Sequence, residues 1–475
     1  MEKINPEIFR LYDIRGAYPR DLNKETSYQI GRYFIHFLRA KNKKSRLKIV
    51  VGRDIRLSSP VLFKGFSDGV LDEGCDIIDI GLATTPMLYF AISNFHYDGG
   101  VIITASHNPN PFNGLKLSRE KAIPISGETG IFLMRDYLAK NRFLRDAKSN
   151  LRGRVVKKSI ENEYINFNIK LAGVKRGEID GLSVAMDAGN GVGGSITLKI
   201  LKKMAVKTHC LYCLPDGSFP NHVPDPSLKE NLRDIIALTK KKKLTLGIAL
   251  DGDADRIVFI DEGGKPVSGD MIIALMAKIL LKSSGHGKIL FDVRSSNAVG
   301  EVISENGGEP VVYRIGHALI KEKMRQDNIF FGGEFSGHYY LGGDLFYEVP
   351  IFVLLKILKE IKKEKRVLSN LIKPYKRYYH SGEINFEIKE KEEKKKEIKN
   401  LYRNGKTLEI DGLRVDFDDW WFLVRASNTE PVLRLVIEAK TRAMLEEKKK
   451  ELIKIIGSPI ISKPLIYRGL KNKAR

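Results

Sequence analysis

Cysteine is scarce in this sequence, with three residues in 475, too few to build a disulfide framework. We therefore expect a reducing, intracellular compartment. Cys210 and Cys213 have the spacing of half a zinc site, but no second pair completes it. Residues 206–214 are predicted to be a strand, in which positions three apart point to opposite faces. We therefore expect both thiols, like that of Cys75, to have packing roles.

Long apolar runs are also missing. The longest stretches, at 271–281 and 351–358, fall well short of the ~18 residues that a membrane-spanning helix needs. The amino-terminal residues lack the apolar core and the small-residue cleavage site of a secretory signal. We expect a soluble, cytoplasmic protein that does not bind a membrane.

Acidic residues are fewer than basic ones, 58 against 81, which gives a net charge of +23. In the segment 389–399 lysine and glutamate intermix, and the lysine run 240–243 lacks interleaved aromatic residues. This distribution favours a solvated surface over a nucleic-acid site. A positive field would also attract a phosphorylated small molecule. We expect a monomer or a weak homo-oligomer that does not bind nucleic acid.

Buried strands alternate with helical patterns through most of the chain, in three successive groups of three. After about residue 370 the pattern changes to strands and to helices rich in lysine and glutamate. The length suits three or four domains. The strands expected in the three groups are 47–51, 75–80 and 101–104, then 182–187, 206–214 and 246–250, then 288–292, 310–314 and 329–333.

The predicted fold class is α/β, with three similar α/β modules that contain mixed sheets, plus a C-terminal α+β domain, arranged around a central cleft. Loops at the carboxyl ends of strands are the expected place for chemistry in such modules. The domains expected are 1–150, 151–262, 263–370 and 371–475.

Three carboxylates, Asp251, Asp253 and Asp255, occupy alternate positions of one glycine-containing loop. Without a cation they would repel one another, so the loop predicts a hard divalent ion, Mg²⁺ above all. A calcium EF-hand does not fit, because Arg256 stands where that loop needs glycine and because the flanking segments are predicted strands.

The segment 189–194 matches Gly-x-Gly-x-x-Gly after a predicted strand, as a dinucleotide site does. The acidic residue expected about 20 positions later is missing, since that region reads Thr208-His209-Cys210. A tight turn is therefore the better interpretation.

Ser106 lies in a loop whose neighbours favour turns, so an ordinary polar loop serine is one interpretation. A serine hydroxyl is a poor nucleophile unless it is activated. The alternative interpretation is that Ser106 is phosphorylated, because the same chain carries a predicted metal site and several cations. A metal ion held by the three aspartates would partly neutralise the charge of the phosphoryl group and prepare it for in-line transfer.

Four motifs carry a family resemblance, in the order 104–109 (Thr-Ala-Ser-His-Asn-Pro), 251–256 (Asp-Gly-Asp-Ala-Asp-Arg), 333–338 (Gly-Glu-Phe-Ser-Gly-His) and 425–431 (Arg-Ala-Ser-Asn-Thr-Glu-Pro). With them the chain resembles the α-D-phosphohexomutase family over nearly its whole length, and most of all the bacterial phosphomannomutase/phosphoglucomutase branch. The resemblance implies interconversion of hexose 1-phosphate and hexose 6-phosphate, of mannose and/or glucose. The intermediate and activator would be a hexose 1,6-bisphosphate.

The resemblance also implies a role for each of the four domains, which would carry the phosphoserine, Mg²⁺, the sugar and a second phosphate in turn. Mg²⁺ would be bound by Ser106, through its phosphate, and by the three aspartates. The residues implied for the substrate, a phosphosugar, are Tyr12, Arg294, Glu334, Ser336, His338, Arg425, Ser427, Asn428 and Thr429.

Proton transfer is assigned by the same resemblance to Lys116 and His317, with Arg15 and Arg256 as charge stabilisers. His317 would titrate near working pH. Lys116 would need cationic neighbours to lower its pKa before it could exchange a proton.

Two segments depart from the family pattern. Arg294 stands where a lysine is expected. Residues 346–350 read Phe-Tyr-Glu-Val-Pro, where the family usually has acidic residues and a glycine that opens a helix. The alternatives are a phosphoglucosamine mutase, a phosphoserine phosphohydrolase and a non-catalytic phosphosugar-binding protein. The second phosphate site at Arg425 argues against the phosphohydrolase. The departures near Arg294 and Glu348 leave the non-catalytic protein as an alternative.

Overall fold

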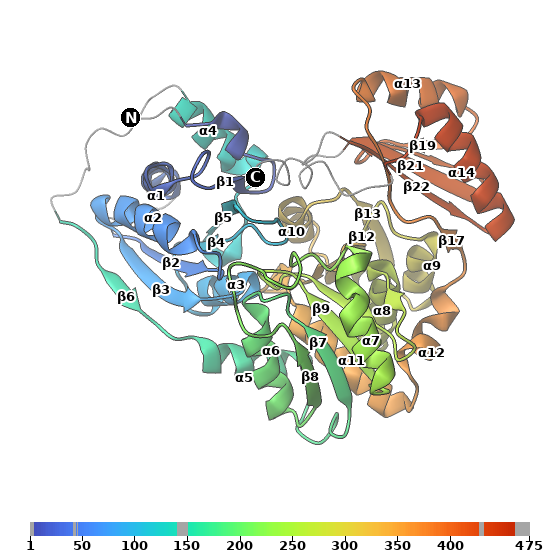
Figure 1. Ribbon diagram of the computed structural model, residues 1–475, viewed down its shortest axis with the longest axis horizontal. Coiled ribbons are helices and arrows are strands. Elements are labelled where there is room, and N and C mark those ends of the chain that lie inside the picture. Colours follow the sequence, from blue (N-terminus) through green and yellow to red (C-terminus); the bar gives the residue numbers. More distant parts are fainter. Residues whose placement is uncertain (1–3, 41–43, 45, 140–150, 427–431, 461–475) are drawn as a thin grey trace. The chain divides into compact units, whose positions relative to one another are not determined.

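The protein is described from a computed structural model that covers residues 4–40, 44, 46–139, 151–426 and 432–460. It forms two compact units. The first unit comprises Met1–Ile272 and Gly316–Leu371, and the second comprises Ile273–Ile315 and Ile372–Arg475. Figure 1 shows their helices and strands, coloured along the sequence. Within these described residues, no helix is both long and apolar enough to cross a membrane.

A six-stranded mixed sheet, in the order β1-β5-β4-β2-β3-β6, opens the first unit. Its β2, β3, β4 and β6 pair in parallel, whereas β5 is antiparallel to both β4 and β1. Strand β4 is buried throughout, as expected in the interior of an α/β sheet. The elements are β1 (Ile14–Ala17), α1 (Lys24–Arg39), β2 (Lys48–Arg53), α2 (Ser59–Asp72), β3 (Asp76–Leu82), α3 (Thr85–Asn94), β4 (Gly99–Ile103), β5 (Phe112–Arg119), α4 (Phe132–Ala139) and β6 (Val155–Lys157).

A second sheet of the first unit has the order β11-β10-β9-β7-β8. Strands β8, β7 and β9 are parallel, and β9 turns back into β10 as an antiparallel hairpin. The loop of this hairpin is the aspartate segment. The elements are α5 (Glu161–Ala172), β7 (Ser183–Asp187), α6 (Gly193–Lys203), β8 (Lys207–Leu211), α7 (Arg233–Lys241), β9 (Leu246–Leu250), β10 (Ile257–Ile260) and β11 (Pro266–Val267).

The rest of the first unit is an antiparallel ladder of three short strands between two helices. The hairpin from β14 to β15 contains the predicted sugar loop. The elements are α10 (His317–Gln326), β14 (Phe331–Gly333), β15 (Tyr339–Leu341), β16 (Tyr347–Glu348) and α11 (Pro350–Glu364).

The second unit contains the parallel pair β12 and β13 and a sheet with the order β17-β22-β21-β20-β19, in which β18 also pairs with β22. Trp421, Leu423 and Val436 pack with Val293 in one buried cluster of this unit. Two helices, α8 (Gly269–Ser284) and α12 (Leu368–Ile372), have residues in both units. The other elements of the second unit are β12 (Lys288–Asp292), α9 (Asn297–Glu305), β13 (Glu309–Tyr313), β17 (Tyr379–His380), β18 (Ile384–Phe386), α13 (Lys391–Leu401), β19 (Lys406–Leu408), β20 (Leu413–Asp416), β21 (Trp420–Ala426), β22 (Leu433–Ala439) and α14 (Arg442–Ile456).

These elements confirm the predicted fold class, three α/β regions with mixed sheets followed by an α+β domain. β9 and β12 coincide with their predicted residue ranges. The expectation for Cys210 and Cys213 is wrong, because they form a disulfide with their Cα atoms 6.0 Å apart. β8 ends at Leu211 and Tyr212 has a φ of 52°, so the chain turns before Cys213 and strand alternation no longer applies. Cys75 is buried and free, as expected.

Helices α1 and α2 pack closely because glycines stand at their contact. A Cβ on Gly31 would lie 2.3 Å from the carbonyl oxygen of Phe66, and one on Gly65 would lie 2.2 Å from that of Lys24. Both approaches are to backbone atoms, which cannot move aside as a flexible side chain can.

We predict that Gly31→Ala lowers the free energy of unfolding by roughly 1 to 3 kcal/mol, because the methyl group overpacks this contact. Thermal and urea unfolding measure the effect. Gly300→Ala, within α9, is the matched control, because its nearest neighbour would lie at 3.4 Å. Better helix propensity there predicts unchanged or higher stability, by up to ~1 kcal/mol. Equal unfolding midpoints for Gly31→Ala and the wild-type protein would contradict the prediction.

Candidate active site

The 104–109 loop holds Ser106 in a left-handed backbone conformation, with a φ of 50°. Non-glycine residues rarely adopt this region, and such strain recurs at functional sites. The Ser106 N–H donates to Thr104 Oγ1 at 2.8 Å, and Arg56 Nη2 donates to the Ser106 carbonyl oxygen at 2.8 Å. Arg56 is itself buried and paired with Asp54 at 3.0 Å. The buried ion pair of Arg56 and Asp54 therefore holds the backbone of the serine loop in place.

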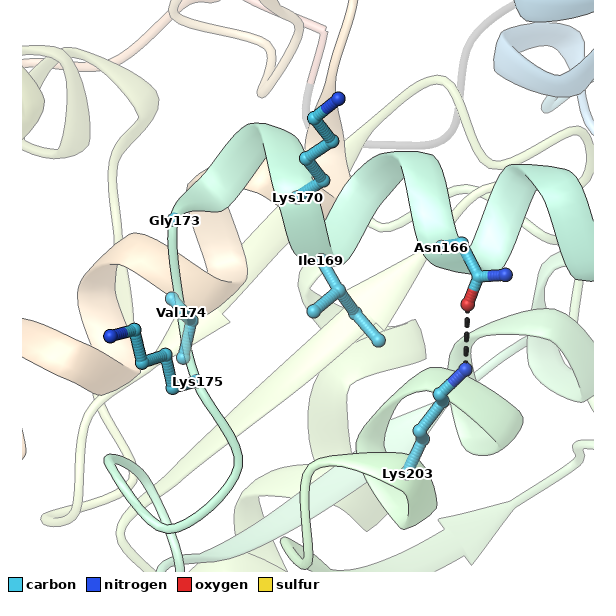
Figure 2. Close-up of a pocket in the computed structure, with 7 residues that line it drawn as sticks. All are labelled: Asn166, Ile169, Lys170, Gly173, Val174, Lys175 and Lys203. Atoms are coloured by element: carbon cyan, nitrogen blue, oxygen red, sulfur yellow. Dashed lines mark hydrogen bonds between the residues drawn. The ribbon is translucent and has the colours of Figure 1, made fainter.

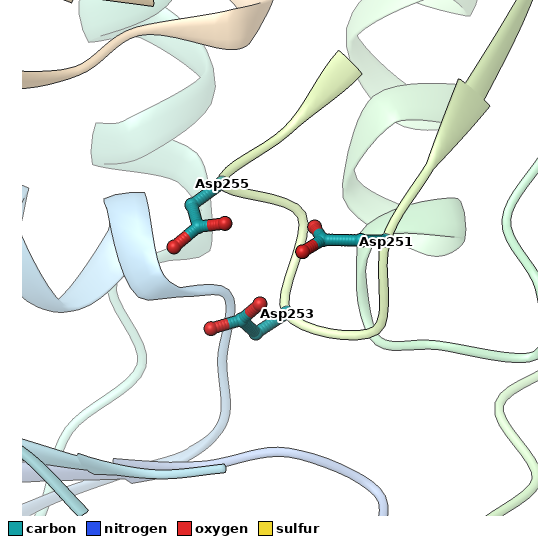
Figure 3. Close-up of side chains that lie close together, drawn as sticks. All are labelled: Asp251, Asp253 and Asp255. Atoms are coloured by element: carbon teal, nitrogen blue, oxygen red, sulfur yellow. The ribbon is translucent and has the colours of Figure 1, made fainter. Parts of the chain in front are cut away.

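The three aspartates of the β9–β10 loop face a common space. Figure 3 shows their carboxylates turned toward the same side of the loop. Asp251, Asp253 and Asp255 are each 0% exposed and offer ligand oxygens within 4.8 Å of one another. Burial, and then Asp255 and Asp253, raise the pKa of Asp251. In the described part of the chain Asp253 Oδ1 has no hydrogen-bond partner. The arrangement fits a hard divalent cation.

Ser106 lies directly against this cluster. Its Oγ donates to Asp251 Oδ2 at 2.7 Å, and the serine is 2% exposed. Gly252 makes the approach possible, because a Cβ there would lie 2.5 Å from the Ser106 carbonyl oxygen. The glycine between the first two aspartates therefore lets the two loops touch backbone to backbone.

Lys116, on β5, supplies the countercharge. Its Nζ donates to Asp253 Oδ2 at 2.7 Å and to Asp255 Oδ2 at 2.5 Å, with all three side chains buried. Burial alone would lower the pKa of Lys116, but Asp253, Asp255 and Asp251 raise it. The partners of Lys116 are therefore carboxylates, and not the cationic neighbours that it would need in order to exchange a proton. Lys116 is surrounded by carboxylates, stays protonated, and lowers the pKa of Asp255 in return.

Two arginines lie on either side of the serine loop. Arg256 Nη2 donates to His107 Nδ1 at 2.6 Å, and this nitrogen lies 3.1 Å from Ser106 Oγ. Burial and the Arg256 charge lower the pKa of His107 well below its usual value, so its ring is neutral. Arg15, on β1, donates to the side-chain oxygen of Asn108. Both guanidinium groups therefore bond residues that follow Ser106 in the loop, and not the Ser106 hydroxyl itself.

The β14–β15 loop brings a carboxylate, that of Glu334, and an imidazole, that of His338, close to the aspartate cluster. Glu334 Oε1 accepts the Gly316 N–H at 3.1 Å, and Glu334 Oε2 lies 2.9 Å from His338 Nδ1. Burial disfavours charge on His338, but Glu334 and Asp255 raise its pKa to about 9. His338 Nε2 lies 3.3 Å from Asp255 Oδ1, and its Nδ1 lies 3.2 Å from Ser336 Oγ. His338 thus links the sugar loop to the aspartate cluster.

Tyr12 and His317 lie beside this loop. Gly316 has a φ of 127°, and a Cβ there would lie 2.4 Å from Tyr12, so only glycine fits before the helix. The Tyr12 and His317 rings are 6.2 Å apart. Burial, and then Lys321 and Lys116, lower the pKa of His317 well below its usual value. The expectation that His317 titrates near working pH is therefore wrong, because its buried ring is neutral. The structure thus brings twelve of the predicted residues into one unit: Tyr12, Arg15, Ser106, Lys116, Asp251, Asp253, Asp255, Arg256, His317, Glu334, Ser336 and His338.

The two remaining predicted arginines belong to the second unit and converge on one carboxylate. Glu383 Oε1 accepts from Arg425 Nη2 at 3.2 Å, and Glu383 Oε2 lies 3.5 Å from Arg294 Nη1 and 3.7 Å from Arg434 Nη1. Burial would raise the pKa of Glu383, but the three arginines lower it to about 2. Ser427, Asn428 and Thr429 lie outside the described residues.

Several contacts of the site were not predicted. Thr85, the first residue of α3, donates from Oγ1 to Asp253 Oδ2 at 2.6 Å. The Thr-Thr-Pro sequence before a helical pattern marks a helix start and could have directed attention to it. No helical or strand spacing in the sequence indicated the contacts of Arg56 and His107. Lys321 is a lysine four residues after His317 on the same helix face, a spacing that could have been noticed.

A pocket of about 300 Å³ lies elsewhere on the first unit, between residues of α5 and α6, and Figure 2 shows it. Its lysines are on the surface, and Lys203 Nζ donates to Asn166 Oδ1 at 2.6 Å. The pocket contains none of the predicted site residues. It is lined by Asn166, Ile169, Lys170, Gly173, Val174, Lys175 and Lys203.

Comparison with known families gives four matches in sequence order, together covering most of the chain. They are described as phosphoglucomutase/phosphomannomutase alpha/beta/alpha domain I at residues 6–142, domain II at 162–264, domain III at 268–378, and the C-terminal domain at 383–455. The chain belongs to the phosphoglucomutase/phosphomannomutase family.

Members of this family align with the chain from end to end. It is 36% identical to a phosphomannomutase of Methanocaldococcus jannaschii, over 95% of this chain and 97% of that protein. It is 36% identical to a phosphomannomutase/phosphoglucomutase of Pseudomonas aeruginosa, over 93% and 94% of the two chains. A crystal structure of a family protein from Burkholderia thailandensis superposes with a TM-score of 0.85 at 29% identity, covering 95% of this chain and 97% of that one.

Arg294 stands where the resemblance led us to expect a lysine, and its guanidinium lies close to two carboxylates. Its Nη2 donates to Asp292 Oδ2 at 2.7 Å and its Nε to Asp292 Oδ1 at 3.1 Å, while Nη1 lies near Glu383. The planar guanidinium group of an arginine can pair with one carboxylate through two of its nitrogens and still reach a second carboxylate with the third. The single ammonium group of a lysine is less able to do so.

We predict that Glu383→Gln removes a pH-dependent part of the stability. The pKa of Glu383 is lowered on folding, so its contribution is present above about pH 4.5 and is lost as pH falls toward 2. The loss amounts to roughly 3 kcal/mol. Urea unfolding between pH 6 and pH 2.5 measures it, with Glu446→Gln, an exposed carboxylate of the same unit, as the matched control. Parallel stability curves for Glu383→Gln and the wild-type protein would contradict the assignment.

Proposed function

We propose that this protein is a phosphohexomutase that interconverts hexose 1-phosphate and hexose 6-phosphate through a phosphorylated Ser106 and a hexose 1,6-bisphosphate. The observation that carries the proposal is the contact of Ser106 Oγ with Asp251 Oδ2, at 2.7 Å, inside a buried cluster of three carboxylates. Family membership supports the same reaction. The bisphosphate would also activate the enzyme by phosphorylating Ser106.

The aspartate cluster fits Mg²⁺, because the free Asp253 Oδ1 and its two neighbours form an all-oxygen donor set. Asp251, Asp253 and Asp255 would hold the ion together with a phosphate oxygen on Ser106. When bound, Mg²⁺ would neutralise phosphate charge and favour in-line transfer.

The residues of the chain provide the remaining electrostatics. PhosphoSer106 passes its phosphoryl group to a free hydroxyl of the hexose, so the bond from phosphorus to the serine oxygen breaks as the bond to the sugar oxygen forms. Arg15, Arg256 and the protonated Lys116 stabilise the charge on the transferring group. His317, neutral in its buried position, accepts the hydroxyl proton. The bisphosphate then turns over and returns its other phosphate to Ser106.

Glu334, Ser336 and His338 are suited to the sugar, because a carboxylate, a hydroxyl and an imidazolium on one short loop offer both acceptors and donors. Such a set can exchange partners when the ring is reversed. Tyr12 lies beside His317, with ring centroids 6.2 Å apart.

In the second unit Arg425 and Arg294 provide guanidinium groups for the phosphate that is not being transferred. Arg425 Nε has no hydrogen-bond partner among the described residues, although its side chain is only 5% exposed, so it retains capacity for an anion. Ser427, Asn428 and Thr429 follow it in sequence and would add hydroxyl and amide donors.

We predict that Ser106→Ala lowers kcat by at least about a thousandfold, because it removes the only proposed phosphoryl acceptor of the enzyme. Binding of glucose 1-phosphate, measured by calorimetry, should change little. Ser218→Ala, an exposed serine of the first unit, is the matched control and should retain full turnover. Turnover by Ser106→Ala within tenfold of the wild-type protein would contradict the mechanism.

The sugar specificity that we propose is mannose and/or glucose. Phe335 and Asn428 match the mannose and glucose branch, whereas the glucosamine branch typically has Gln and Gly there, and the relatives bear phosphomannomutase and phosphoglucomutase names.

We predict that kcat/KM for mannose 1-phosphate or glucose 1-phosphate exceeds that for glucosamine 1-phosphate by at least about tenfold, the discrimination that one differing polar contact provides. A side-by-side turnover assay on the three substrates measures it. Preference for glucosamine 1-phosphate would favour the alternative of a phosphoglucosamine mutase. No turnover of any of them would favour a non-catalytic phosphosugar-binding protein.

A further inference from the structure

A fully buried ion pair lies behind His317 and has no part in the mechanism above. Lys321, on α10, and Glu348, in β16, are both 0% exposed. Lys321 Nζ donates to both carboxylate oxygens of Glu348 at 3.0 Å and to the hydroxyl of Tyr89 at 3.1 Å. Replacing a buried pair by apolar residues is often neutral or stabilising, so stability alone does not account for it.

His317 is the nearest functional side chain to this pair. His317 and Lys321 are four residues apart on α10, and His317 Nδ1 lies 3.7 Å from Glu348 Oε1. Within the described residues neither ring nitrogen of His317 has a hydrogen-bond partner. A buried imidazole with two unsatisfied nitrogens needs an explanation, since buried polar groups are almost always paired.

The surroundings fix where Glu348 points. Lys321 bonds both oxygens of its carboxylate and also bonds the hydroxyl of Tyr89. The Tyr89 ring packs against Tyr347 with ring centroids 5.8 Å apart. Across the β15–β16 ladder Glu348 is the register partner of Tyr340, whose hydroxyl donates to Glu334 at 2.6 Å. The paired Glu348 carboxylate is therefore held with its Oε1 atom 3.7 Å from His317 Nδ1.

We propose that Glu348, held by Lys321, is a positioning residue that fixes the orientation and tautomer of His317. A carboxylate beside Nδ1 keeps the proton on that nitrogen and leaves the Nε2 lone pair for the hexose hydroxyl. When the hydroxyl attacks phosphoSer106, its O–H bond breaks and an Nε2–H bond forms, and Glu348 stabilises the imidazolium. The proton is then given to the other oxygen of the hexose, when the reoriented bisphosphate returns that oxygen's phosphoryl group to Ser106.

The inference rests on the proposed function of His317, and a double-mutant cycle separates the two. Glu348→Gln keeps the shape of the side chain but removes its charge. We expect kcat to fall by roughly 10- to 100-fold, as for other residues that orient a functional histidine, with KM within about threefold of wild type. Glu348→Asp, which restores a shorter carboxylate, should recover part of the loss. In a His317→Gln background the same Glu348→Gln change should alter kcat by less than about twofold.

Removing one partner of a buried pair can unfold the protein, so Lys321→Met combined with Glu348→Gln is measured as well, because it leaves no uncompensated charge. We expect this double variant to fold and to show the same loss of kcat as Glu348→Gln. Glu161→Gln, which breaks the exposed pair with Lys199 in the same unit, is the matched control and should leave kcat unchanged.

Two results would overturn the proposal. One is a loss in the His317→Gln background as large as that in the wild-type background, which would show that Glu348 acts by another route. The other is recovery of full kcat in the Lys321→Met/Glu348→Gln variant, which would show that only the unpaired lysine charge is harmful. If His317→Gln is itself fully active, the proposed role of His317 fails and the inference fails with it, whereas mutase activity of the wild-type protein still stands.

Discussion

The bond from Lys116 to Asp253 and Asp255 is the interaction on which the first unit depends. Three carboxylates with no exposed surface could not remain ionised together without a cation among them. Lys116 comes from the first sheet and the aspartates from a hairpin of the second sheet, so their pairing also ties the two sheets of that unit together. The same buried charges therefore stabilise the first unit and form part of the proposed active site.

Contacts with the same aspartate loop also position Ser106. The aspartate loop can reach the serine loop only because Gly252 has no side chain, and Arg56 holds the serine loop in a conformation that few serines adopt. The serine oxygen is thereby directed at a carboxylate while cations lie nearby. A hydroxyl in this position is preorganised to carry a charged group, since the compensating charges are present before any ligand binds.

Much of this site could be predicted from the sequence, because its principal residues form short, chemically unusual loops at the ends of strong strand patterns. Asp251 and its neighbours are an example, as is Ser106. The electrostatic state of Lys116 could not be predicted, because it depends on which side chains a distant loop brings to it. Glu348 and Lys321 are missed for the same reason. Cys213 shows a local failure, since one residue with positive φ ended the strand earlier than its composition indicated.

The central claim is that the oxygen held beside the aspartates is the one that carries phosphate. The most direct test is incubation of the purified protein with glucose 1,6-bisphosphate, followed by intact-mass measurement and peptide mapping. The account predicts one phosphoryl group per chain, located on Ser106 and absent from Ser106→Ala. A protein that stays unmodified, or that carries its phosphate on another residue, would contradict it.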